Sequence, residues 1–398
     1  MNYKPVIDFI RSLYPSRNFI PLHEPYFGGN EKKYVLDCID STYVSSVGKY
    51  VDLFEKMIQE FTGVKRAVAT VNGTAALHIA LLLAGVKPGD LVITQPLTFI
   101  ATCNAISYCG ADPVFVDIDR DTLGMSPEAL EQWLSENVVI EGIEGREGLD
   151  GLASSTQLSQ PVALYKWAKR PISACIPMHT FGHPCRIDRI IEICDRYHIP
   201  VVEDSAESIG SYYEGQHTGT FGKLGILSFN GNKTITTGGG GMVLTNDEEL
   251  GKLAKHITTT AKKPHPWLFE HDMTGYNYRL PNINAAIGCA QMEMLPEMIR
   301  SKRDLAQRYQ DYFLDLPEIE YITEPSNSIS NYWLNCILLP DEQARNRFLQ
   351  ETNDQKVMTR PAWILMNQLK MFETALCGGL VTSMNIVARL VNIPSSIM

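Results

Sequence analysis

An acid and a lysine in the middle of the chain are the residues best suited, by type and position, to do chemistry. Asp204 follows a short apolar run at 200–203, which predicts a buried strand that ends in a carboxylate. Lys233 lies on a later polar segment rich in asparagine and glycine, where the backbone can approach a ligand closely. The carboxylate is suited to pair with a cationic ring nitrogen, and a partly desolvated lysine amine can form a Schiff base with an aldehyde.

The segment from Asn72 to Thr74 has the chemistry of a phosphate site. It lies between an apolar run and a helical pattern, so Gly73 falls at a helix N-terminus, where free amides and the helix dipole favour an anion. A phosphate cup, an acid for a ring nitrogen and a lysine for an aldehyde are together what pyridoxal phosphate requires. Taken singly, each part also has an ordinary interpretation, as a capped helix start, an ion-paired acid and a solvated lysine.

The surrounding chain alternates between short apolar runs and amphipathic stretches. Runs typical of strands lie at 67–71, 91–94, 113–117, 174–178, 200–203, 224–229 and 242–244, and helical patterns lie at 75–83, 100–109, 127–136 and 187–197. This alternation predicts a largely parallel sheet with helices on both faces. Ligands bind such sheets at the carboxyl ends of the strands, where Asp204 is expected.

The pattern changes near residue 255. A long helical pattern at 283–316, interrupted at Pro296, precedes an apolar strand at 333–339 and a helix at 342–351. We therefore expect a large domain at 1–255, including an N-terminal arm, and a linking helix with a smaller α+β domain at 256–398. The stretch 140–162, rich in Gly, Glu, Ser and Gln, is predicted to be a surface loop, whose role the sequence does not indicate.

Composition argues against several classes of protein. The formal net charge is −10 and there is no basic run, so binding to nucleic acid is not expected. No apolar stretch approaches the roughly 18–20 residues of a membrane span, and charges near the start argue against a signal peptide. The nine cysteines are scattered, which favours free thiols in the cytoplasm. Cys185 and Cys194 lack the closely paired ligands of a zinc site, so no metal is expected.

Several ordered motifs resemble the DegT/DnrJ sugar aminotransferases, which are pyridoxal phosphate enzymes with the aspartate aminotransferase fold (fold type I). The resemblance rests on 72–77 (NGTAAL), 97–102 (LTFIAT), 179–184 (HTFGHP), 203–207 (EDSAE), 228–233 (SFNGNK), 276–280 (YNYRL) and 391–396 (VNIPSS). It covers nearly the whole chain. It implies an α/β large domain with a mostly parallel seven-stranded sheet and a smaller C-terminal α+β domain. The run 43–48 (YVSSVG), with 229–233, is similar to a LegC-like subgroup from the bacillosamine and legionaminic acid pathways.

The resemblance also implies roles for individual residues. Lys233 binds the cofactor covalently and moves protons, Asp204 pairs with the pyridine nitrogen, and Phe99 stacks on the ring. Glu207 occupies a place near the ring where the family usually has Gln or His. The full set expected to bind the cofactor is Gly73, Thr74, Phe99, Asp204, Glu207, Ser228, Asn230, Lys233 and Asn277. Asn277 would reach the cofactor of a neighbouring subunit, which implies a homodimer with composite sites.

The expected activity is transfer of an amino group from L-glutamate to C4 of a nucleotide-linked 4-keto-6-deoxy sugar, for bacterial surface glycan or glycoprotein sugars. Ser45, Ser46, His179, His183 and Arg279 are candidate substrate contacts, although turn or packing roles fit them as well. A GDP-linked sugar, giving perosamine, is the main alternative. A dehydratase is disfavoured because that activity accompanies histidine in place of the lysine, and a non-catalytic relative is disfavoured by the intact Lys233 and Asp204.

Overall fold

The computed structural model describes residues 2–143 and 160–398. Its helices are α1 (Lys4–Leu13), α2 (Glu31–Asp40), α3 (Lys49–Thr62), α4 (Gly73–Ala84), α5 (Ile100–Tyr108), α6 (Pro127–Asn137), η1 (Thr180–Gly182), α7 (Ile187–Arg196), α8 (Glu248–Thr258), α9 (Asn282–Leu314), α10 (Glu342–Asp354), η2 (Met366–Gln368) and α11 (Val381–Arg389). Among the residues described, no helix is both long and apolar enough to cross a membrane.

The strands fall in the order β1 (Arg66–Thr70), β2 (Leu91–Thr94), β3 (Asp112–Phe115), β4 (Val138–Ile143), β5 (Gln160–Tyr165), β6 (Arg170–Ile176), β7 (Val202–Asp204), β8 (Tyr212–Tyr213), β9 (Gln216–His217), β10 (Leu224–Ser228), β11 (Gly241–Thr245), β12 (Glu320–Tyr321), β13 (Ser328–Ile329), β14 (Asn335–Leu338), β15 (Arg360–Pro361), β16 (Leu376–Cys377) and β17 (Leu390–Ile393). All seven strand-like runs of the sequence correspond to strands, because each is a short apolar run with polar or glycine-rich ends.

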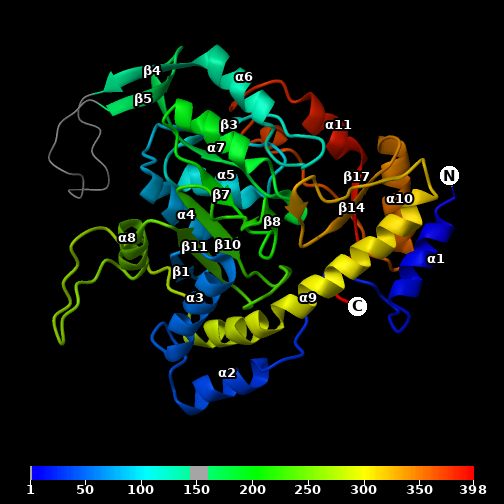
Figure 1. The fold of residues 1–398 in the computed structure, drawn as a ribbon, viewed down its shortest axis with the longest axis horizontal. Coiled ribbons are helices and arrows are strands. Elements are labelled where there is room, and N and C mark those ends of the chain that lie inside the picture. The colour runs from blue at the N-terminus through cyan, green and yellow to red at the C-terminus, as the bar shows by residue number, and fades with distance from the viewer. Residues whose placement is uncertain (1, 144–159) are drawn as a thin grey trace.

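A central sheet of seven strands organises the first two thirds of the chain (Figure 1). Hydrogen-bonded pairing gives the order β1-β11-β10-β7 on one side and β6-β2-β3 on the other. Two parallel bridges, Cys175 to Val201 and Met178 to Asp204, join β6 to β7. Only β11 among these seven runs antiparallel to its neighbours. The expected mostly parallel seven-stranded sheet is therefore confirmed.

Helices cover both faces of this sheet. One face packs against α4, α5 and α8 through residues such as Val92, Val202 and Val243. The opposite face packs against α3 and α9 near β1, β10 and β11, and against α6 and α7 near β2, β3 and β6. Neighbouring strand residues alternate between the two faces, as Val243 does with Met242, because side chains along a strand point in opposite directions.

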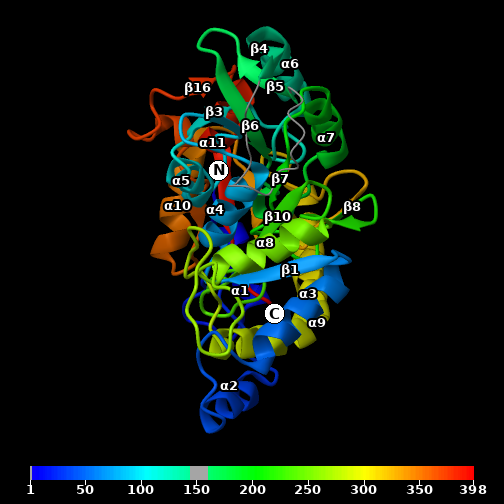
Figure 2. The ribbon, with the colours of Figure 1, turned by 90° about the vertical axis from the view of Figure 1, so that its left-hand side faces the viewer.

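The hairpin β4–β5 corrects the prediction that 140–162 is a loop. Residues 140–143 belong to β4 and 160–162 to β5, which pair in antiparallel fashion; residues 144–159 lie outside the described residues. The polar composition of this stretch resembles that of a loop, but β5 pairs with β6 in antiparallel fashion, so the hairpin extends the edge of the large sheet. This hairpin and α6 lie at one end of the molecule, and α2 lies at the other (Figure 2).

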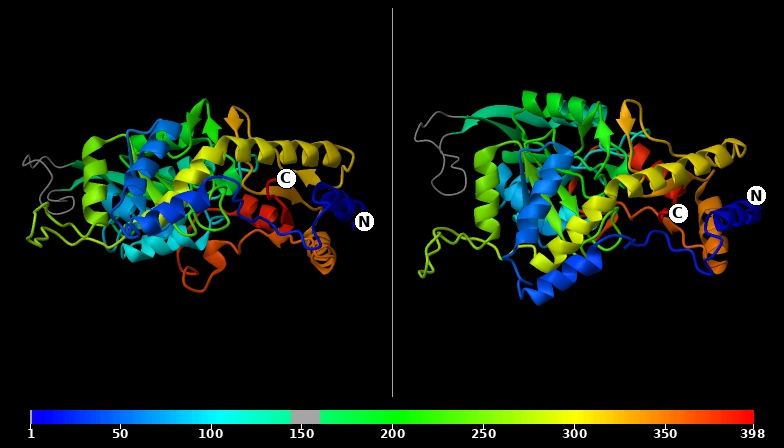
Figure 3. Two further views of the ribbon diagram at one scale, coloured as in Figure 1. Left: turned by 90° about the horizontal axis from the view of Figure 1, so that it is seen from below. Right: turned by 60° about the horizontal axis from the view of Figure 1, so that its bottom comes forward.

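Helix α9 corrects the prediction of an interruption at Pro296. The helix continues from Asn282 to Leu314 with Pro296 inside it. Leu295 and Met298 on either side are buried in the core, so packing compensates for the hydrogen bond that proline cannot donate. The same helix spans from the large sheet to the C-terminal part of the chain (Figure 3).

A second sheet, ordered β12-β14-β17-β15, forms in the C-terminal part. It packs with α1, because Ile7 and Ile10 share a buried cluster with Ile337, Phe348 and other residues of this part. The C-terminal strand β16 adds to the edge of the large sheet, parallel to β3.

Candidate active site

A cavity of about 290 Å³ opens where the parallel strands end. It is lined by Asn72, Gly73, Thr74, Leu77, Phe99, Ala101, Met178, Asp204, Ala206, Glu207, Ile226, Ser228, Asn230, Asn232, Lys233, Gly239, Gly240, Trp333 and Trp363. Every residue expected to bind the cofactor lines this cavity except Asn277. Many of them follow the carboxyl ends of β1, β2, β7 and β10, in agreement with the general position of ligands in parallel sheets.

One end of the cavity is the N-terminus of α4. The Asn72 side chain caps this helix by accepting a hydrogen bond from the amide of Ala75 at 2.7 Å. The first amides of a helix have no partner within the helix, so those of Gly73 and Thr74 are available to an anion. A Cβ on Gly73 would lie 2.9 Å from the Cβ of Ser228, so only glycine permits this close approach. The arrangement is a cradle suited to a phosphate group.

Asp204 lies at the end of β7, beneath the cavity. Its side chain is almost fully buried, and its Oδ2 accepts a hydrogen bond from the Thr102 hydroxyl at 2.7 Å. Burial raises the pKa of the Asp204 carboxyl, although the Thr102 hydroxyl, the Ala206 amide and the charge of Lys233 act in the opposite direction. A buried carboxylate in such a place is stabilised by a cation, and a protonated ring nitrogen can provide it.

Lys233 reaches the cavity from the loop after β10. Its side chain is 11% exposed, and its Nζ lies 4.1 Å from the centroid of the Trp333 ring. The Trp333 indole donates a hydrogen bond to the carbonyl of Asn232 at 2.6 Å, which fixes the ring beside the lysine. The interpretation of Lys233 as a solvated surface lysine is therefore wrong.

Glu207 is the nearest acid to this lysine. Its Oε1 accepts from Lys233 Nζ at 3.1 Å, and its Oε2 accepts from the amide of Phe181 at 2.9 Å. Burial raises the pKa of the Glu207 carboxyl to about 7 in spite of the nearby lysine. The lysine in the cavity is thus paired with a carboxyl group that can exchange a proton near neutral pH.

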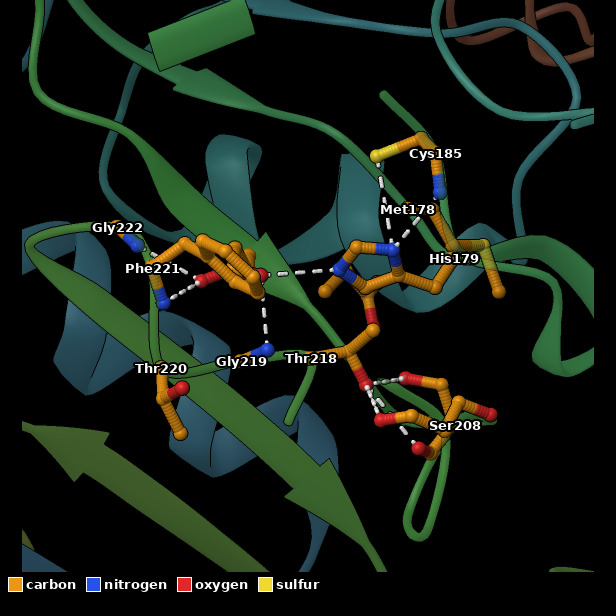
Figure 4. Close-up of polar contacts among 12 residues, drawn as sticks. Met178, His179, Cys185, Ser208, Thr218, Gly219, Thr220, Phe221 and Gly222 are labelled. Carbon is orange, nitrogen blue, oxygen red and sulfur yellow. Dashed lines mark hydrogen bonds and ion pairs between the residues drawn. The ribbon is translucent and has the colours of Figure 1, made fainter. Parts of the chain in front are cut away.

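A second polar network lies behind Asp204, with the His179 ring between Cys185 on one side and Gly219, Phe221 and Gly222 on the other (Figure 4). His179 Nε2 is 3.0 Å from Glu203 Oε2, and its Nδ1 is 3.5 Å from the Cys185 sulfur. Burial alone lowers the pKa of His179, but the Cys185 and Glu203 groups outweigh burial and raise it to about 10.

This network does not reach the cavity, although it supports the strand end beside it. The main-chain amide of His179 donates to the carbonyl of Asp204 at 3.1 Å. His179 is fully buried and does not line the cavity. His183 is fully buried too, and within the described part of the chain neither of its ring nitrogens has a hydrogen-bond partner. Burial lowers the pKa of His183 to about 4, so its ring is neutral at pH 7.

The remaining candidate residues, for the cofactor and for the substrate, also lie outside the cavity of their own chain. Asn277 is exposed, and its side-chain oxygen accepts a hydrogen bond from Arg279 at 3.2 Å. Ser45 contributes only its carbonyl, which accepts from the amide of Asn282 at 2.6 Å, and Ser46 does not line the cavity. Within the described residues, no group of three or more His, Cys, Asp or Glu side chains could hold a metal ion.

Two tryptophans that line the cavity were not predicted from the sequence as site residues. Trp333 was grouped with the apolar strand at 333–339, and Trp363 stood near no recognisable motif. Trp363 packs against Phe99, with ring centroids 6.0 Å apart, and against Phe181 at 5.2 Å. Phe99 itself is 46% exposed and lines the cavity, which is consistent with a ring that faces a ligand.

The residues that line the cavity fit pyridoxal phosphate in their donor set. The cradle formed by Gly73 and Ser228 suits the phosphate, Asp204 suits the ring nitrogen, and Lys233 suits the aldehyde. Fold and site together define an aminotransferase-like enzyme of fold type I.

Comparison with known proteins identifies the family. Residues 25–397 match the DegT/DnrJ/EryC1/StrS aminotransferase family, and the chain belongs to it. It is 37% identical over 357 residues to EpsN of Bacillus subtilis (strain 168), named as a pyridoxal phosphate-dependent aminotransferase (90% of this chain, 84% of EpsN). It is 36% identical over 354 residues to the GDP-perosamine synthase of Escherichia coli O157:H7 (89% and 87% of the two chains).

The fold is shared with solved structures of aminotransferases. The Helicobacter pylori aminotransferase PseC, involved in the biosynthesis of pseudoaminic acid, matches with a TM-score of 0.80 and 23% identity, over 94% of this chain and 93% of PseC. The protein is therefore a pyridoxal phosphate-dependent sugar aminotransferase with the fold that the motifs implied. These relatives do not single out the LegC-like subgroup.

Proposed function

We propose that this enzyme transfers an amino group from L-glutamate to C4 of a nucleotide-linked 4-keto-6-deoxy sugar, of the UDP-2-acetamido-2,6-dideoxy class. The product would serve bacterial surface glycan or glycoprotein sugar biosynthesis. The observation that carries the proposal is the position of Lys233, held in the cavity between Glu207 and Trp333. The similarity of 43–48 and 229–233 to enzymes of the bacillosamine and legionaminic acid pathways supports the choice of sugar.

In this reaction some residues of the chain would bind the cofactor, and Lys233 would transfer protons. The start of α4 and Ser228 would hold the phosphate, and Asp204 would keep the ring nitrogen protonated, which is the state that suits an electron sink. Lys233 Nζ would move a proton from the donor's α carbon to C4′ of the cofactor in the first half of the reaction, and from C4′ to C4 of the sugar in the second half. Pyridoxal phosphate, when bound, supplies the aldehyde and the electron sink.

A second candidate is the same transfer to a GDP-linked 4-keto-6-deoxy sugar. It is supported by relatives named GDP-perosamine synthase in Escherichia coli and Vibrio cholerae, at 36% and 35% identity. The two candidates differ in the nucleotide and in the acetamido group, and the catalytic residues named above serve both equally.

A substrate panel tests the choice. The purified enzyme, glutamate and a set of UDP-, GDP- and dTDP-linked 4-keto sugars are incubated separately, and the product mass is measured. We expect an amino sugar from the UDP-linked acetamido substrate. A product from the GDP-linked sugar alone favours the second candidate, and amination of none of the sugars would contradict both.

We further propose a homodimer whose sites draw residues from both subunits. Asn277 lies outside the cavity of its own chain, which is consistent with a role in the site of a partner. Nearby, the segment after α8 extends away from the body with Trp267, Leu268 and Phe269 exposed (Figure 1).

Subunit mixing tests this arrangement. Lys233→Ala and Asn277→Ala are each expected to be nearly inactive as homodimers. A mixed dimer carries both defects in one site and none in the other if the site is composite. Activity should therefore reappear on mixing, whereas continued inactivity in demonstrated mixed dimers would show that Asn277 does not serve the partner's site.

A further inference from the structure

The two carboxylate oxygens of Glu207 have different hydrogen-bond partners. Oε2 is fixed by the amide of Phe181, whose φ of 58° is a backbone conformation that few non-glycine residues adopt. Oε1 faces Lys233 Nζ at 3.1 Å. The side chain is 1% exposed, so water contributes little to stabilising its charge.

The charged groups around Glu207 leave its carboxylate dependent on the lysine. From the loop after β10, Lys233 favours the charged form, and from the end of β7, Asp204 opposes it. The nearby Asn331 donates a hydrogen bond to the main-chain carbonyl of Glu207, at 2.9 Å, and not to its carboxylate. When the lysine amine loses its positive charge, Phe181 is the one other hydrogen-bond donor to this carboxylate among the described residues, and a buried charge with so little support is costly.

We propose that Glu207 is the catalytic proton acceptor for Lys233, a role that rests on the proposed function. A lysine ammonium must lose a proton before its nitrogen can attack an aldehyde or take a proton from a substrate carbon. In this step an N–H bond of Lys233 Nζ breaks and an O–H bond forms at Glu207 Oε1. An ammonium and a carboxylate become a neutral amine and a neutral acid, so the proton stays in the site.

The electrostatics of the pair support this transfer. The pKa of about 7 places Glu207 where it can gain or lose a proton near neutral pH, which is the range that suits a general base. Sharing one proton also avoids leaving an unpaired charge in the buried site. A glutamine at this position could accept a hydrogen bond from the lysine but could not take its proton.

Proton counting during cofactor loading tests the proposal. Pyridoxal phosphate is added to cofactor-free protein in weak buffer at pH 8, and proton release is measured with an indicator. Glu207→Gln is expected to release about one proton per site more than the wild type, because its lysine proton passes to water. The difference should vanish near pH 6, where Glu207 is already protonated. Equal release at pH 8 would overturn the proposal.

A second glutamate–lysine pair, whose lysine is more exposed, provides the control. Glu55 accepts from Lys255 Nζ at 2.6 Å, and burial raises the pKa of its carboxyl also. Because this pair lies outside the cavity, Glu55→Gln should release as many protons on loading as the wild type does.

An infrared measurement makes the test independent of how the Glu207 variant folds. Loading wild-type protein at pH 8 should produce a protonated-carboxyl band that shifts when glutamate carboxyls carry ¹³C, and not when aspartate carboxyls do. Absence of this band in protein whose cofactor is covalently attached to Lys233 would overturn the inference and leave the proposed function intact. Failure of wild-type protein to attach the cofactor at Lys233 would instead contradict the proposed function.

Discussion

Glu203 and Glu207 lie on either side of Asp204 and differ in what holds their charge. Both are buried, but Glu203 accepts hydrogen bonds from three main-chain amides, at 2.7–2.8 Å, besides facing His179. Glu207 accepts from one amide and faces Lys233 in the cavity. A carboxylate with several fixed donors keeps its charge and its place, whereas one that relies on a reactive amine can change its charge. The comparison therefore separates Glu203, an acid that supports the structure, from Glu207, an acid suited to proton transfer.

The contrast between Glu203 and Glu207 depends most strongly on Lys233 being the amine that binds the cofactor. Lys233→Ala should lower turnover by more than about 10⁴-fold, because the nucleophile and the general base are lost together. Borohydride reduction of the wild type followed by peptide mapping should place the cofactor on Lys233. The variant should keep its circular dichroism spectrum and lose the reducible adduct.

Lys302 is the alternative amine to exclude in that experiment. It is fully buried in α9, and burial lowers its pKa to about 7. Finding the adduct on Lys302 would overturn the assignment of Lys233. Lys302→Met is expected to retain the adduct.

Asp204→Asn tests the acid that lies between the two glutamates. An amide cannot hold the ring nitrogen in its protonated form, so turnover should fall by about 10²–10⁴-fold. Retention of the cofactor should change much less, because the phosphate cradle and Lys233 remain. Parallel measurement of kcat and of the cofactor dissociation constant checks this, and near-normal turnover would contradict the proposed role of Asp204.

The stabilities of Glu203 and Glu207 variants sharpen the contrast. Glu203→Ala should lower the free energy of unfolding by about 3–5 kcal/mol, because His179 and three amides lose their acceptor. Glu207→Gln should change it by less than about 1 kcal/mol, since the amide oxygen still accepts hydrogen bonds. Urea unfolding of the cofactor-free proteins measures both. Equal losses would mean that both acids are structural.

The smallest expected effect is on the pH dependence of protein stability, through the buried amine of Lys302. The pKa of Lys302 is lowered to about 7 in the folded protein, so the unfolded chain binds more protons above that pH. Stability should therefore rise from pH 7 to 9 by up to about 1.4 kcal/mol per pH unit more in the wild type than in Lys302→Met. Identical slopes in urea unfolding would show that Lys302 titrates normally.

The sequence predicted the sheet and most of the site because both follow from local patterns. Strand runs and the Asn72–Thr74 helix start depend on residues near each other in the chain, and Asp204 and Lys233 follow two strands of one sheet. The Glu207–Lys233 contact joins separate segments and was not predictable from either one. Trp363 reaches the cavity only through the packing of the C-terminal part, which no local pattern encodes.

The errors have a similar origin. The continuity of α9 through Pro296 depends on tertiary burial, and the hairpin β4–β5 has a polar composition typical of loops. The predicted division of the chain near residue 255 remains a prediction. Two contacts join the parts on either side of that division. Helix α1 packs with the C-terminal sheet, and β16 pairs with β3 of the large sheet.

The packing of α1 with the C-terminal part of the chain also affects how the protein folds during its synthesis. The apolar face of α1 leaves the ribosome before its partners Ile337 and Phe348, which are made more than three hundred residues later. The nascent helix must therefore wait, with its apolar side chains unsheltered, until those residues have been made. The native packing of α1 is consequently completed late, and this helix is where holding chaperones would be needed most.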